Sequence, residues 1–186
     1  RVEPSAERSH GGEQALRLYA VSPSRKMSLT KASLDTELLH FIKGDHFWFS
    51  GWFFLEKGRP TTIMDLECSY IEKSPGMRVL FTEEMRPYLE LKWMSKPTYR
   101  PQRSLNVVLP RRRWVHVKVH LLLSEGNDGE AELWLDGMKV IEGKGQTLPI
   151  SGAVYDRLQV GITANPKETT TVLYVDDVMV SDTRLK

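Results

Sequence analysis

Two neighbouring stretches of this 186-residue chain alternate apolar and polar residues with a period of two, which predicts paired β-strands. In Trp114–Leu122 alternate positions are valine or leucine, and Glu130–Leu135 repeats the pattern. Side chains alternate between the two faces of a strand, so each stretch has one apolar face. Asp136-Gly137 then follows, and this dipeptide suits a type I′ turn, which needs positive φ at both central residues. A slip of one residue would turn each face over, so the register of this hairpin is fixed.

Strand and turn signals continue along the rest of the chain. We count roughly twelve strands at the spacing of a β-sandwich, and no helical periodicity persists beyond about two turns. The stretch Lys96–Gln102 contains two prolines and is predicted to be a loop. The other predicted strands are 15–20, 34–42, 46–56, 61–71, 77–82, 88–93, 138–141, 157–163 and 170–180.

Composition excludes several classes of protein. The chain has 26 basic and 24 acidic residues, and this near balance gives no general attraction to nucleic acid or to a membrane surface. No apolar stretch is long enough to span a bilayer. The single cysteine, Cys68, excludes an internal disulfide. A hydrophobic content of 40% is enough for a full core, so we predict one domain over residues 1–186.

The last predicted strand carries two adjacent acids, Asp176 and Asp177. Strands are poor in aspartate, so this pair needs a cation, a basic side chain or backbone N–H groups as partners. The stretch Tyr174–Val178, together with His10–Leu18, resembles the closing and opening strands of concanavalin A-like and carbohydrate-binding jelly rolls. The resemblance implies an all-β jelly-roll sandwich of two antiparallel sheets that faces a sugar.

In such jelly rolls a closing-strand aspartate often helps to hold a structural calcium ion, which binds six to eight oxygen ligands. Alternation predicts that Asp176 and Asp177 point to opposite faces of the strand. The resemblance implies that Asp176, Asp177, Glu13 and Glu3 are the candidate metal ligands. The alternative is that backbone N–H groups or Arg17 satisfy the aspartates.

Other segments resemble known hairpins and lyase strands. The predicted hairpin of 114–140 resembles one of laminin-G-like and polysaccharide-lyase jelly rolls, and 34–38, 63–67 and 158–165 resemble strands of heparin and alginate lyases. Elimination on a uronate needs positive or neutral donors around the carboxylate and a tyrosine or histidine to move the proton. Other residues stand where the family has its arginine, glutamine, histidine, lysine and tyrosine: Asp35, Asp65, Glu67, Gln159 and Thr163. We therefore predict no catalytic residue of that family, although other bases remain: His40, His46, His116, His120 and Tyr70.

The aromatic stretch His46–Glu56 is the candidate sugar platform. Phe47, Phe49, Phe53 and Leu55 form its more apolar side, which we assign to the core, so Trp48 and Trp52 lie on the opposite side. Sugars stack on flat aromatic rings, but tryptophan is also highly buried on average, so both faces of this strand can be buried. We expect the ligand-binding residues to be Trp48, Trp52, Asp65, Glu67, Arg78, Glu90, Lys92 and Gln159.

Three functions suit this fold, because a jelly roll hosts unrelated activities. The first is a non-catalytic, lectin-like domain that binds a polysaccharide on its concave sheet. The second is a divergent polysaccharide lyase that acts on a uronic-acid polymer, and the third is a structural or adhesion domain of a surface protein. We expect His116, Lys118 and His120 to be exposed on the convex face of the sandwich. We also expect a secreted, periplasmic or surface-exposed bacterial protein: the chain begins at Arg1, for which a trimmed export signal is one explanation and an arbitrary boundary of the segment is the other.

Overall fold

The computed structural model describes residues 1–24, 29–94, 97–102 and 104–185. In this described part, strands are joined by turns and loops, and no helix is both long and apolar enough to cross a lipid bilayer. The strands are β1 (Val2–Ser5), β2 (Ala15–Ala20), β3 (Thr30–Thr36), β4 (His46–Lys57), β5 (Thr62–Glu67), β6 (Gly76–Phe81), β7 (Pro87–Lys92), β8 (Thr98–Tyr99), β9 (Trp114–Leu122), β10 (Glu130–Leu135), β11 (Met138–Lys144), β12 (Arg157–Asn165) and β13 (Thr171–Ser181).

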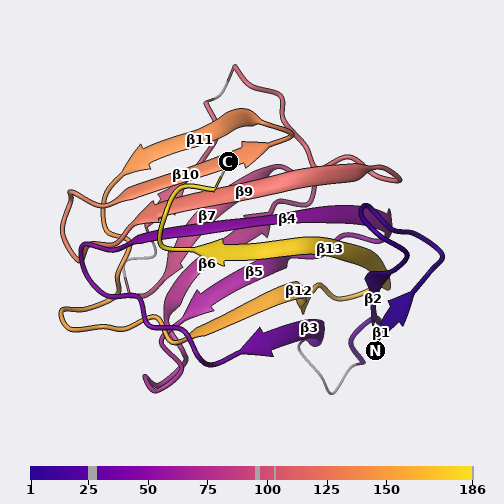
Figure 1. Ribbon diagram of the computed structural model, residues 1–186, viewed down its shortest axis with the longest axis horizontal. Helices are drawn as coiled ribbons and strands as arrows, with labels where there is room; N and C mark the ends of the chain where they lie inside the picture. The colour runs from indigo at the N-terminus through magenta and orange to yellow at the C-terminus, as the bar shows by residue number, and fades with distance from the viewer. Residues whose placement is uncertain (25–28, 95–96, 103, 186) are drawn as a thin grey trace.

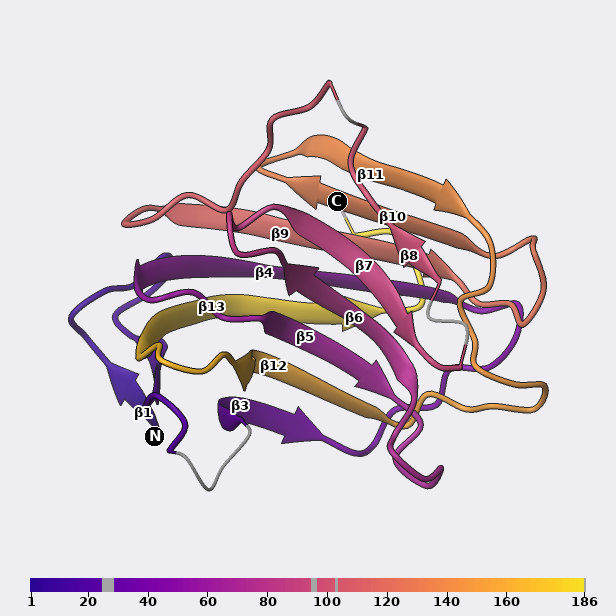
Figure 2. The ribbon, with the colours of Figure 1, turned by 180° about the vertical axis from the view of Figure 1, so that it is seen from behind.

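Two antiparallel sheets pack face to face, which confirms the predicted jelly-roll sandwich. The seven-stranded sheet has the order β1-β2-β13-β4-β9-β10-β11 and lies toward the viewer in Figure 1. The six-stranded sheet has the order β3-β12-β5-β6-β7-β8 and lies toward the viewer in Figure 2. Strands from the two ends of the chain are neighbours, because β13 pairs with both β2 and β4.

The core between the sheets is built by the period-two pattern of the sequence. Phe47, Phe49, Phe53 and Leu55 of β4 are at most 1% exposed and belong to one buried cluster, as predicted. The alternate valines and leucines of β9 join this cluster, and Met64 and Leu66 are among the residues that β5 of the opposite sheet contributes. Fully burying a side chain of this kind contributes about 1.5–3 kcal/mol, so the alternation stabilises the sandwich and fixes which faces point outward.

The predicted hairpin is also confirmed. The whole of β10 pairs with residues 117–122 of β9, and β10 continues into β11 through Asp136-Gly137. The φ angles of these two residues are 49° and 80°, the two positive values that a type I′ turn needs.

Several strand predictions differ from the structure, among them the strand predicted over 61–71, of which β5 forms only Thr62–Glu67. The strand predicted over 34–42 lies instead at 30–36, where β3 pairs with β12, and Phe41 makes only an isolated bridge to Tyr155. The short strands β1 and β8 were not predicted, and β8 lies inside the predicted loop 96–102. Lys96 itself lies outside the described residues. Pairing with a neighbouring strand, which the local sequence does not reveal, forms these elements.

Candidate functional site

Polar side chains form a row across the outer face of the six-stranded sheet. The strand registers place Glu90 of β7 opposite Arg78 of β6, and Arg78 opposite Asp65 of β5. They then place Asp65 opposite Gln159 of β12, and Gln159 opposite Asp35 of β3. These five residues, which we call the first polar row, therefore cross five adjacent strands. With strands about 4.8 Å apart, the row is about 19 Å long, an extended surface suited to a polymer.

A second polar row runs beside the first. It consists of Lys92 on β7, Gly76 on β6, Glu67 on β5 and Arg157 on β12, which are opposite one another in register. A Cβ atom at Gly76 would lie 1.9 Å from the Leu66 carbonyl oxygen, so only glycine fits there. Because Gly76 has no side chain, Lys92 reaches over it toward Glu67.

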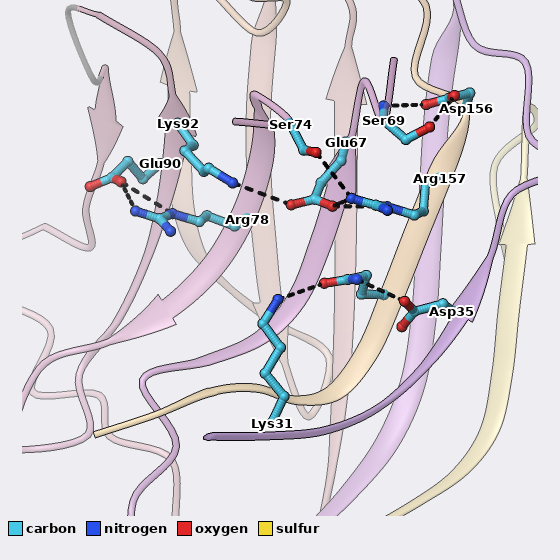
Figure 3. Close-up of polar contacts among 11 residues, drawn as sticks. Lys31, Asp35, Glu67, Ser69, Ser74, Arg78, Glu90, Lys92, Asp156 and Arg157 are labelled. Atoms are coloured by element: carbon cyan, nitrogen blue, oxygen red, sulfur yellow. Dashed lines mark hydrogen bonds and ion pairs between the residues drawn. The ribbon is translucent and has the colours of Figure 1, made fainter. Parts of the chain in front are cut away.

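The Glu67 carboxylate is the buried centre of the second row. Glu67 is only 4% exposed, and its Oε2 accepts a hydrogen bond of 3.0 Å from Arg157 Nε. Its Oε1 lies 3.4 Å from Lys92 Nζ (Figure 3). Arg157 Nη2 also donates to the Ser74 hydroxyl at 3.1 Å, which ties the row to the turn after β5. A buried carboxylate with two cationic partners holds both cations in defined positions on the face.

Hydrogen bonds also order the first row. Arg78 donates to Glu90 from its Nε atom at 3.1 Å, and Gln159 Nε2 donates to Asp35 at 2.8 Å. The ammonium group of Lys31 donates to the Gln159 side-chain oxygen at 3.3 Å (Figure 3). The two rows and Lys31 together carry four cations and four acids, so the face is electrically balanced when all eight are charged.

Asp65 changes this balance. Its side chain lies near the middle of the face and is 7% exposed. Burial raises the pKa of Asp65, and the nearby Glu67 carboxylate raises it further, while the Thr163 hydroxyl, Arg78 and Lys31 act in the opposite direction. The raised pKa favours the protonated form of Asp65, which is a hydrogen-bond donor, and in that form the face has one more positive than negative charge. Such a face attracts an anionic polymer.

Tyr88 lies on the same side of β7 as Glu90, two residues along the strand. The Arg100 guanidinium lies over its ring, with the guanidinium carbon 4.4 Å from the ring centroid. Burial and the Glu90 carboxylate raise the pKa of Tyr88, so its phenol is protonated at neutral pH. The sequence reasoning missed Tyr88 and Arg157, although the alternation of their strands places them beside the predicted site residues Glu90 and Gln159. It also missed Lys31, which lay outside every predicted strand.

The predicted ligand-binding residues divide between the two sheets. Asp65, Glu67, Arg78, Glu90, Lys92 and Gln159 share the outer face of the six-stranded sheet. Trp48 and Trp52 lie on β4, in the other sheet, with side chains opposite the core-facing phenylalanines. The expectation that the tryptophans and the polar residues form one surface was therefore wrong. Alternation assigns a side to each residue but does not say which sheet a strand joins.

Other aromatic rings cover both tryptophans. Trp48 is 8% exposed, and its ring stacks on His120 at 4.1 Å. Trp52 stacks on His10 at 3.7 Å and contacts His116. His120 was expected to be exposed but is 5% exposed, because it is hydrogen-bonded between His46, at 2.8 Å, and Glu132, at 2.7 Å. The seven-stranded sheet thus has a packed aromatic outer face.

The paired aspartates of β13 bind the N-terminal segment. Asp176 Oδ2 accepts hydrogen bonds from the backbone N–H groups of His10 (2.8 Å) and Gly11 (3.1 Å). Asp177 Oδ2 lies 2.7 Å from His10 Nδ1. The expectation that the two carboxylates point to opposite faces was wrong, because the register shifts there and Asp177 has a φ of 48°.

The predicted calcium ligands are not gathered into one site. Glu3 pairs with Arg17 at 3.0 Å, Glu13 is exposed, and Asp176 already accepts two N–H groups. Within the described ranges, no group of three or more histidine, cysteine, aspartate or glutamate side chains could hold a metal ion. The donor set therefore does not fit calcium in this conformation, and calcium binding itself stays an untested prediction.

Comparison with known proteins assigns the family. The profile of the family described as polysaccharide lyase matches residues 2–179 of this chain. The chain belongs to the polysaccharide lyase family. No curated protein matches it significantly by sequence.

Solved structures share the fold of this polysaccharide lyase family member. An endo-β-1,4-glucuronan lyase from the fungus Trichoderma reesei has a TM-score of 0.76 at 15% identity, covering 98% of this chain and 87% of that one. A cellulose-induced protein has a TM-score of 0.68 at 17% identity, with 100% and 87% covered. An alginate lyase from a Chlorella virus has a TM-score of 0.60 at 11% identity, with 97% and 89% covered.

The positions at which this sequence departs from the lyase strands lie together. Asp35, Asp65 and Gln159 occupy the first polar row, and Glu67 occupies the second. Thr163 lies farther along β12 and is 1% exposed. The resemblance therefore identified one surface, and this surface has its own set of charged groups.

Proposed function

We propose that this chain is a polysaccharide lyase that cleaves a uronic-acid polymer lying along the two polar rows. The observation that carries the proposal is the pair of rows itself, in a chain whose family is polysaccharide lyase. An extended face with four ordered cations suits a polymer that carries one carboxylate on each sugar.

Arg78 and Asp65 are the groups that we assign to the substrate carboxylate. They are opposite each other on β6 and β5, so one carboxylate can contact both. The Arg78 guanidinium supplies charge-assisted hydrogen bonds, and we assign Asp65 the protonated form that its raised pKa favours, in which it supplies a neutral O–H donor. Together they stabilise the negative charge that builds up on the carboxylate when the proton leaves C5 of the sugar.

Tyr88 is the group that we assign to the leaving oxygen. In β-elimination the C5 proton passes to a base, the bond between C4 and the glycosidic oxygen breaks, a C4–C5 double bond forms, and the departing oxygen takes up a proton. We assign the base to the Glu90 carboxylate, which lies opposite Arg78 and two residues from Tyr88 on the same side of β7. A phenol that is protonated at neutral pH can donate that proton. Tyr88 lies beside the Arg78–Glu90 end of the first row, next to the proposed carboxylate site.

The test is to incubate the protein with glucuronan, alginate and neutral cello-oligosaccharides and to follow the ultraviolet absorbance and mass of unsaturated products. We expect products from an acidic polymer only. Tyr88→Phe should lower the rate by about 10²–10⁴-fold, the usual contribution of a general acid, with little change in binding. Tyr19→Phe, on the other sheet, is the control.

A double variant tests the carboxylate site. Arg78→Gln with Glu90→Gln removes the ion pair without leaving a lone charge and should weaken binding of the acidic polymer by about tenfold, or ~1.4 kcal/mol. The control is Lys144→Gln with Glu130→Gln, which removes a 3.2 Å ion pair of the other sheet. Equal affinities for the two double variants would refute the assignment.

The second candidate is a non-catalytic, lectin-like domain that binds the same polymer. The specific observation in its favour is that Asp35, Asp65, Glu67, Gln159 and Thr163 stand where the resembling lyases have other residues. Binding of glucuronan or alginate without unsaturated products would favour it. For either function we propose that the protein acts outside the cell, where such polymers are found, and an export assay in the source organism would test this.

A further inference from the structure

A hollow of about 510 Å³ opens beside the Lys92 end of the second polar row. Its walls come from two loops: the turn between β5 and β6, and the segment that follows β7. Lys92 belongs to both features, because it lines the hollow while its Nζ lies 3.4 Å from Glu67 Oε1. The hollow is therefore continuous with the row.

The turn that forms one wall is held in a strained conformation. Lys73 and Ser74 have φ angles of 66° and 42°, the left-handed region that residues other than glycine rarely adopt. Strain of this kind costs of order 1–3 kcal/mol per residue and is concentrated at functional sites. Ser74 accepts the hydrogen bond from Arg157 (Figure 3). The same turn therefore contacts the second row and forms a wall of the hollow.

The chemistry of the walls suits a charged sugar ring. Trp93 supplies a half-exposed aromatic surface, and Met94, which is 85% exposed, extends it. Two ammonium groups, those of Lys92 and Lys73, and one carboxylate, that of Glu72, border this surface, so the rim carries more positive than negative charge. The side chain of Lys73 is 85% exposed, and its nearest acid, Glu72, is 3.9 Å away, so the Lys73 ammonium is accessible to a ligand.

We propose that this hollow is an end subsite of the polymer-binding face, in which one uronate ring packs against Trp93 while its carboxylate binds Lys73. The inference rests on the proposed function, because the occupant is the next sugar of a polymer that already lies along the rows. Continuity through Lys92 and the positive charge of the rim support an acidic sugar as the occupant. The subsite makes affinity depend on the length of the oligosaccharide.

The experiment is a calorimetric titration with glucuronan and alginate oligosaccharides of increasing length. Lys73→Asn removes the ammonium and keeps a residue that tolerates positive φ. We expect it to weaken the binding of long oligosaccharides by about twofold to fivefold. Trp93→Leu keeps an apolar residue against the core and should weaken long-chain binding by about tenfold. Lys167→Asn, in an exposed turn after β12, is the matched control.

The outcomes separate the two proposals. If the wild type gains affinity with length and both variants lose that gain, while short oligosaccharides bind all proteins equally, the subsite is supported. If the wild type binds and both variants have the same affinity as the wild type at every length, the subsite is refuted, but the proposed binding of polymer along the two rows is not. If the wild type binds none of the acidic oligosaccharides, the proposed function fails and the subsite with it. Melting temperatures near that of the wild type exclude unfolding as the cause of any loss.

Discussion

Replacing Glu67 with glutamine removes the negative charge at the centre of the second polar row. The Glu67 side chain is 6% exposed, whereas those of Arg157 and Lys92 are 21% and 33% exposed. Removing one partner of a fully buried ion pair costs about 3–5 kcal/mol, and an exposed pair contributes about 0–1 kcal/mol. Glutamine keeps one hydrogen-bond acceptor, and the two cations can be solvated by water. We therefore expect Glu67→Gln to lower the free energy of unfolding by about 2–3 kcal/mol.

Thermal unfolding measures this loss. For a chain of this length 1 kcal/mol lowers the melting temperature by about 2–4 °C, so Glu67→Gln should lower it by about 4–12 °C. The control is Glu142→Gln, whose side chain is 73% exposed in its contact with Lys139 and should change stability by under about 1 kcal/mol. A Glu67→Gln protein as stable as the control would refute the view that Glu67 organises the row.

Three further predictions follow from the same contacts. Asp65→Asn should raise the free energy of unfolding near neutral pH. The pKa of Asp65 is higher in the folded state than in the unfolded state, where it is about 3.9. The stability that wild-type Asp65 contributes is therefore complete below the unfolded-state pKa and is lost as the pH rises through the folded-state pKa. Urea unfolding across this range checks the prediction, and a variant that is less stable than wild type at pH 7 would contradict it. Gly76→Ala should cost at least about 1–3 kcal/mol, because the new Cβ meets a backbone oxygen, whereas Gly126→Ala, with its closest contact at 3.0 Å to a side chain, should cost less in the same assay. Adding calcium or a chelator should change the melting temperature by no more than about 1 °C, because Asp176 is already hydrogen-bonded to backbone N–H groups. A larger rise with calcium would support the predicted calcium site instead.

The fold could be predicted because alternation is a local property of the chain. The strands at 114–122 and 130–135 have the predicted bounds, and the Asp136-Gly137 turn has the predicted geometry. Strands without their own pattern were missed or displaced, as β3 shows: its position is set by pairing with β12. The bulge that turns Asp177 toward His10 likewise has no local sequence signal.

The candidate site was predicted in part for the same reason. Alternation grouped Asp65 with Glu67, and the resemblance to lyase strands added Gln159, which the structure places beside Asp65. The tryptophans of β4 were assigned to the same surface because a strand pattern gives the side of each residue but not its sheet. Gly76 was not predicted to be important, because its role is to leave out a Cβ atom that would clash with the Leu66 carbonyl oxygen.

The most direct test of the central claim is the search for unsaturated uronate ends after incubation of the wild-type protein with glucuronan and with alginate. The account predicts new ultraviolet absorbance and oligosaccharides with an unsaturated end from at least one of the two polymers, and none from cello-oligosaccharides. Binding without such products would contradict the lyase assignment and leave a binding face. If the protein neither binds these polymers nor forms products from them, the assignment of the polar rows as a polysaccharide site is contradicted.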